Sequence, residues 1–135
     1  MPLPSDRHEE LLEILAREPA DAWGDIVALW ATTERVYTLP AGPNGFIHPA
    51  YELVTLIVER IDDFLYYLTN DVTNENPIVC AYCLTCLEQA DRLQLSMHQI
   101  DELQHRTEVL DVSSGCFGSS PTLSQFFELN GDSFL

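Results

Sequence analysis

The segment CAYCLTC, residues 80–86, has the clearest potential for chemistry, because it contains cysteine at every third position. Its cysteines, Cys80, Cys83 and Cys86, have the C-x2-C-x2-C spacing with which iron–sulfur proteins wrap a cluster. Such a segment forms a loop and needs a further cysteine, often after three intervening residues. That position holds Ala90 in this chain.

The same segment also fits a buried helix. Asn76–Pro77 combines an N-cap residue with proline at the first helical position, so a helix is expected from there to about Arg92. A continuous helix spreads the sulfurs over about 9 Å of rise, whereas zinc needs ligand sulfurs within about 4 Å of one another. The residues around the cysteines are apolar on nearly all sides: Ile78, Val79, Ala81, Tyr82, Leu84 and Leu87. We therefore predict that the cysteines are core residues and that the protein has no cofactor.

A second candidate lies on the helix expected over residues 96–109, where His98, Glu102 and His105 project from one face. Two imidazoles and a carboxylate are plausible ligands for zinc or iron. The Glu102-x-x-His105 spacing also occurs in di-iron bundles, but those need two copies and this chain has one. We interpret the three residues as a solvated helix face, with a metal-dependent enzyme as an alternative.

Cys116 is the third candidate. It lies in the loop sequence SSGCFGSS, a better setting for a reactive thiol than a buried helix. A cysteine nucleophile also needs an activating base, usually histidine, and the sequence does not place one beside it. A thiol-dependent enzyme stays open as an alternative to an ordinary packed loop.

The elements that would position these residues are helices. Hydrophobic periodicity and capping residues predict six helical segments, at about 5–18, 21–37, 49–70, 76–92, 96–109 and 121–130. Ser5, Asp6 and Asp21 are N-cap candidates, and Ser96 with Gln99 forms a capping-box pattern. The stretch VYTL at 36–39 is the best strand candidate and is short. We predict one all-α domain over residues 1–135, a bundle of about six antiparallel helices, with contact or packing loops at 38–48 and 111–120.

The segment NPIVCAYCLTCLEQAD, residues 76–91, resembles one helix of a HEAT-type helical repeat. Together with the helix expected over 49–70 it would form one helix pair, so the resemblance implies a short HEAT-like α-solenoid as the alternative to a bundle. The whole chain, which is small, acidic and helical, also resembles the cytosolic immunity proteins that bacteria make against their own polymorphic toxins. That resemblance implies a non-enzymatic protein that neutralises a toxin domain by binding it directly.

The net charge of -16 is the most unusual property of the composition: 22 carboxylates face six cations, all of them arginine. Such a charge repels nucleic acid and anionic membranes and steers basic partners toward the surface. Solubility needs a net charge of only about 2–8 in a small domain, so a use for the excess is plausible. A halophilic host is the alternative explanation of the acidity.

The sequence also gives an expectation about the compartment. The N-terminus, MPLPSDRHEE, has neither the basic nor the apolar region of a secretory signal, and no stretch reaches the roughly 20 apolar residues of a membrane helix. We expect a cytoplasmic protein with reduced cysteines.

The helix expected over 49–70 provides the candidate binding face. Its apolar residues share one side, and carboxylates and a tyrosine align on the other over about three turns. The candidate contacts near this stripe are Phe46, Tyr51, Glu52, Glu59, Asp62, Asp63, Tyr66, Tyr67, Asp71 and Glu75.

We therefore predict an acidic protein that neutralises a basic protein partner, most simply a toxin domain, without binding nucleic acid or membrane. Three alternatives remain: a nucleic-acid mimic that occupies a DNA- or RNA-binding groove, a metal- or thiol-dependent enzyme, and a plain helical scaffold. The identity of the partner and the oligomeric state do not follow from the sequence.

Overall fold

The computed structural model describes residues 4–38, 47–114 and 117–130. Most of these residues are helical, and none of the helices they form is long and apolar enough to cross a membrane. The helices are α1 (His8–Leu15), α2 (Pro19–Ala31), α3 (Pro49–Val58), α4 (Ile61–Asp71), α5 (Pro77–Gln89), α6 (Met97–Gln104) and α7 (Leu123–Asn130). The strands are β1 (Val36–Tyr37), β2 (Val112–Ser114) and β3 (Phe117–Ser119). The prediction of an all-α chain is right for most of the described residues and wrong for this small sheet.

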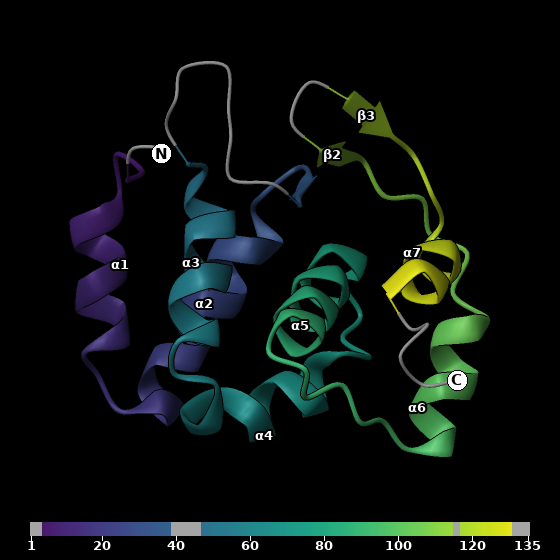
Figure 1. The fold of residues 1–135 in the computed structure, drawn as a ribbon, viewed down its shortest axis with the longest axis horizontal. Helices are drawn as coiled ribbons and strands as arrows, with labels where there is room; N and C mark the ends of the chain where they lie inside the picture. Colours follow the sequence, from purple (N-terminus) through teal and green to yellow (C-terminus); the bar gives the residue numbers. More distant parts are fainter. Residues whose placement is uncertain (1–3, 39–46, 115–116, 131–135) are drawn as a thin grey trace.

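Helix α5 forms the centre of the molecule. It packs against α2, α3, α4, α7 and β1, with α1, α2 and α3 on one side and α6, α7 and the β2–β3 hairpin on the other (Figure 1). Every residue from Val79 to Leu87 is buried. A helix that is apolar on all sides buries its side chains only when other elements pack around it, and α5 is such a central helix, as predicted.

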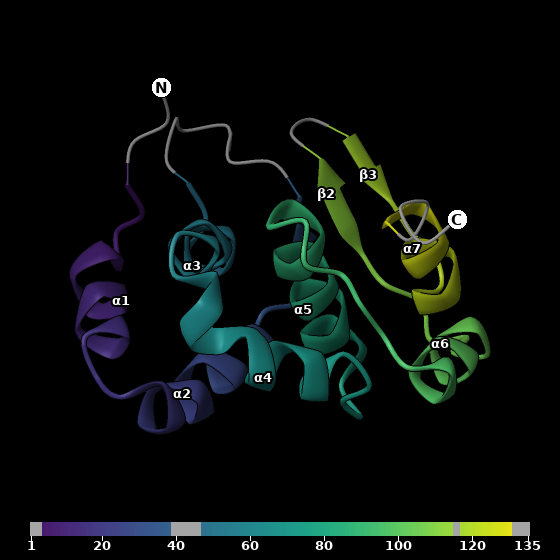
Figure 2. The same ribbon diagram turned by 60° about the horizontal axis from the view of Figure 1, so that its bottom comes forward.

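The single helix expected over residues 49–70 is instead two helices. The chain leaves the helical conformation at Arg60, where φ is -125° and ψ is 37°. The Arg60 guanidinium donates to the carbonyl of Leu15 at the end of α1 and to Asp63, 3.1 Å away. The turn sets α4 across the molecule beside α2 and α5 (Figure 2), where Phe64 is fully buried.

The strands connect distant parts of the chain. Strand β1 pairs in parallel with β2, Val36 opposite Val112, and β2 pairs antiparallel with β3. Tyr82 of α5 holds β1 in place, because its hydroxyl donates to the carbonyl of Arg35 at 2.8 Å and accepts from the N–H of Tyr37 at 3.0 Å. Val36 and Tyr37 of the short strand candidate therefore pair, whereas the loop predicted over 111–120 contains the paired strands β2 and β3.

Several helix ends confirm the capping predictions. The side chain of Asn76 accepts from the N–H groups of Ile78 and Val79, and Ser96 and Gln99 form a reciprocal capping box. Other ends differ from the predictions, and the start of α2 follows a local signal, because Pro19 occupies its first turn. Helix α1 begins after Arg7, α2 begins after Glu18, and the second and fifth predicted helices end early, at Ala31 and Gln104.

Helix α5 ends in a Schellman motif that offers a stability test. Asp91 has a φ of 55°, in the left-handed region, and the N–H of Arg92 donates to the carbonyl of Leu87 at 2.9 Å. Glycine adopts this conformation without strain, so Asp91→Gly is expected to raise the free energy of unfolding by about 0.5–1 kcal/mol in urea denaturation. Asp91→Ala is the control and should give no gain; a glycine variant no more stable than the alanine variant would contradict the strain assigned to Asp91.

Candidate functional site

The three cysteines of α5 lie in the core, as predicted. Cys80, Cys83 and Cys86 are free thiols with no exposed surface. Burial raises the pKa of Cys80 to about 11 and those of the other two well above their usual range. The thiol of Cys80 donates to the carbonyl of Asn74 at 2.9 Å. These residues act as small apolar side chains that fill the centre of the fold.

This placement predicts very slow alkylation. At about pH 8 a thiol with a pKa of about 11 is almost entirely protonated, and burial also blocks the reagent. Iodoacetamide should label Cys80, Cys83 and Cys86 in the folded protein on the order of 100-fold more slowly than in urea. Mass spectrometry of the tryptic peptide 61–92, which contains all three, measures the rate. Equal labelling rates in the folded and unfolded protein would show that the thiols are accessible.

The candidate metal site on α6 gains no support from the geometry. His98 and His105 are exposed, and Nδ1 of His105 lies 2.7 Å from the carbonyl oxygen of Asp101 on its own helix. Within the described ranges, no group of three or more His, Cys, Asp or Glu side chains, including Glu102, is arranged to hold a metal ion. Cys116 lies outside the described residues.

The exposed side of α4 carries the predicted acidic surface. Glu59, Asp62, Asp63, Tyr66 and Asn70, which we call the α4 face, are all exposed. At the helical repeat Asp62, Asp63, Tyr66 and Asn70 lie on the same side of α4, and Glu59 lies at the turn that precedes this helix. Helix α4 runs along the outside of the molecule (Figure 2). Tyr66 is 72% exposed, the most exposed aromatic side chain among the described residues. The face thus combines three carboxylates with a tyrosine.

Aromatic rings pack against Tyr66 on the side of the face that is turned toward α2. The Tyr66 ring meets the ring of Tyr67 edge-on at 5.4 Å, and Tyr67 packs on Trp23 of α2 at 5.7 Å. The indole N–H of Trp23 donates to the carboxylate of Asp71. Tyr67 and Asp71 therefore contact α2 and support the α4 face from that side. Side chains that are already packed in the free protein lower the entropic cost of binding.

Two predicted contacts are buried instead. Tyr51 and Glu52 are only 7% and 5% exposed, because α3 faces α1 and α5 rather than continuing the line of α4. The Glu52 carboxylate accepts from the Ser5 hydroxyl at 2.6 Å and lies 3.0 Å from Nδ1 of His8. Glu52 thus fastens the segment before α1 to α3, and the predicted stripe of three continuous turns is wrong. Glu75 is exposed between α4 and α5, whereas Phe46 lies outside the described residues.

Arginine pairing leaves the acidic surplus intact. Asp62 pairs with Arg92 at 2.9 Å and Asp63 with Arg60 at 3.1 Å, so two carboxylates of the α4 face are partly neutralised. The other ion pairs with arginine in the described ranges are Arg7–Glu10, Arg17–Asp25 and Arg106–Glu108. With so few cations, most carboxylates of the described residues have no arginine partner, and the surface potential stays strongly negative.

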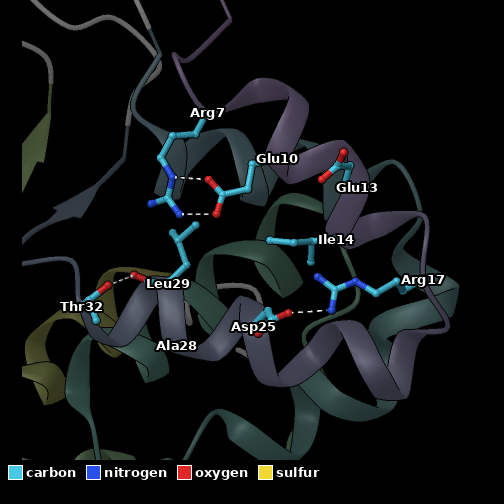
Figure 3. A pocket seen from close by; sticks show the side chains of 9 residues that line it. All are labelled: Arg7, Glu10, Glu13, Ile14, Arg17, Asp25, Ala28, Leu29 and Thr32. Carbon is cyan, nitrogen blue, oxygen red and sulfur yellow. Dashed lines mark hydrogen bonds and ion pairs between the residues drawn. The ribbon is translucent and has the colours of Figure 1, made fainter.

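Sequence reasoning missed a hollow between α1 and α2. It measures about 390 Å³ and is lined by two of these ion pairs, Arg7–Glu10 and Arg17–Asp25, with Glu13 at its edge (Figure 3). The hollow has a mixed-charge rim and an apolar floor formed by Ile14 and Leu29. Only the spacing of the charges along α1 could have indicated it, and that spacing is common on solvated helices.

No protein-family model, curated protein or solved structure matches this chain.

Proposed function

We propose that the protein is a non-enzymatic inhibitor that binds a basic protein through the α4 face, in the manner of a bacterial immunity protein acting on a toxin domain. The observation that carries the proposal is the exposed Tyr66, 72% accessible, among the carboxylates of Glu59, Asp62 and Asp63. Tyrosine is enriched at the energetic centre of protein interfaces, and surrounding charges select and steer the partner.

The net charge of the chain supports the proposal that its partner is a basic protein. A net charge of -16 raises the local concentration of a basic protein and accelerates encounter by long-range attraction. Contact with the exposed ring of Tyr66 then slows dissociation. The α4 face lies outside the packed core, so a partner can reach it without unfolding any element described above.

The finer form of the proposal concerns architecture and compartment. We propose that α3 to α5 form a HEAT-like unit, that the protein acts in the cytoplasm, and that it binds neither nucleic acid nor membrane. In this arrangement the buried α5 is the inner helix, and α4 lies on the outside with its polar side toward the solvent.

The test is capture of the partner from a lysate of the native host on the immobilised, tagged protein at low and high salt. We expect one basic protein to be retained at low salt at near-equal stoichiometry. Mass spectrometry identifies this partner, and its activity should be lost while it is bound to the immobilised protein. Screening weakens exposed charge pairs, so retention should fall as salt rises. Retention of a DNA- or RNA-binding protein that free DNA displaces would favour the nucleic-acid mimic, and retention of nothing would overturn both.

A further inference from the structure

His48 caps α3 in a way that depends on its protonation. Its Nδ1 atom accepts a hydrogen bond from the backbone N–H of Ala50 at 3.1 Å. A histidine nitrogen accepts only when it carries no proton, so this cap requires the neutral ring with its proton on Nε2. The same ring stacks on Tyr37 of β1, with centroids 3.9 Å apart and planes 13° apart. One imidazole therefore joins the start of α3 to the sheet.

The charged groups around His48 have opposite effects on its pKa. The ring borders a hollow of about 510 Å³, which is also lined by Asp6, Arg7, Glu34 and Tyr37. Burial lowers the pKa of His48 below its ordinary 6.5; Asp6 opposes this shift and Arg7 adds to it. The positive end of the α3 dipole also disfavours a cation at the cap position.

We propose that His48 is a pH-sensitive switch: the neutral ring caps α3 and stacks on Tyr37, whereas the protonated ring releases the Ala50 N–H and turns toward Asp6 and Glu34. The only covalent change is the uptake of one proton from solvent at Nδ1. Both carboxylates already line the hollow beside the ring, so the imidazolium has partners on the segment before α1 and on the α2–β1 connection.

The direction of the pH effect follows from the lowered pKa. The folded protein holds the proton on His48 less tightly than the unfolded chain does. The stabilising cap is therefore fully present above about 6.5 and is lost as the pH falls through the lower pKa of the folded state. The other imidazole at this end is His8, which pairs with Glu52 on the first turn of α3.

Amide hydrogen exchange of the full-length protein, followed by NMR from about pH 7.5 to about pH 5, tests the switch. After correction for the intrinsic exchange rate, protection of the Ala50 amide should fall about fivefold as the pH drops, the equivalent of losing one helix N-cap. His48→Asn keeps a good capping side chain that does not titrate, so it should abolish the fall. His98→Asn changes an exposed histidine on α6 and should behave as the wild type does.

A titration of the wild type gives a second readout that needs no variant. The chemical shift of the Ala50 amide should change with the same midpoint as the His48 ring protons, and that midpoint should lie below the ordinary histidine pKa of 6.5. An Ala50 amide that ignores the titration of His48, or a His48→Asn protein that loses protection as the wild type does, would overturn the proposal.

Discussion

Replacing Trp30 with alanine is expected to lower the free energy of unfolding by about 3–5 kcal/mol, measured by urea denaturation. Trp30 is fully buried where α2, α3 and α5 meet. Its ring stacks on Tyr82 at 5.4 Å and meets Trp23 edge-on at 6.0 Å, and its indole N–H donates to the carbonyl of Ala50 at 3.1 Å. The substitution removes this packing and the hydrogen bond to the carbonyl of Ala50.

Trp30→Phe is the matched control, because it keeps an aromatic ring on Tyr82 and removes the N–H. We expect a smaller loss, about 1–3 kcal/mol. A change below about 1 kcal/mol for Trp30→Ala would show that α2 does not pack on α5 as described, since large-to-small substitutions in a filled core cost more than that.

Changing Glu59 and Asp63 together to lysine is expected to slow association with the captured partner by about tenfold or more at low salt. Both residues lie on the α4 face, and the change replaces attraction of a basic surface by repulsion. Stopped-flow or surface-plasmon measurement of the association rate at two salt concentrations gives the result. The difference should shrink at high salt, because ions screen exposed charges beyond about 10 Å at 0.1 M.

Glu9→Lys with Glu128→Lys provides the control for this prediction. These exposed glutamates lie on α1 and α7, at opposite ends of the molecule (Figure 1), and their reversal changes the net charge by the same amount. If position matters, the control should slow association clearly less than the α4 pair. Equal slowing in both variants would assign steering to overall charge, and an unchanged rate in the α4 variant would count against steering by this face.

The central helix could be predicted from local pattern because its signals agree with one another. Asn76–Pro77 starts α5, and the apolar residues that surround the cysteines predict burial on every side. The capping box of Ser96 and Gln99 was visible for the same reason, since it needs only residues three positions apart.

The features that could not be predicted from the sequence depend on contacts between residues far apart in the chain. The apolar positions at Ile57, Ile61 and Phe64 suit one helix or two, and the break depends on Arg60 reaching Leu15. The β1–β2 pairing joins segments with no shared local pattern.

The binding face was predicted only in part, for the same reason. Asp62, Asp63 and Tyr66 share a side of α4, as helical periodicity predicts, and Glu59 is exposed at the turn before this helix. Glu52 was assigned to that side by extending the same period across the break, and its contacts with Ser5 and His8 could not be inferred from spacing. The hollow between α1 and α2 depends on the packing of two helices and left no motif in the chain.

Hydrogen–deuterium exchange of the protein alone and in complex with the captured partner tests the binding face most directly. We expect slower exchange on binding over residues 59–71, with little change in α1 and α7, where the control glutamates lie. Protection of the α1–α2 hollow or of α6 and α7, with residues 59–71 unchanged, would contradict the assignment of partner binding to the α4 face.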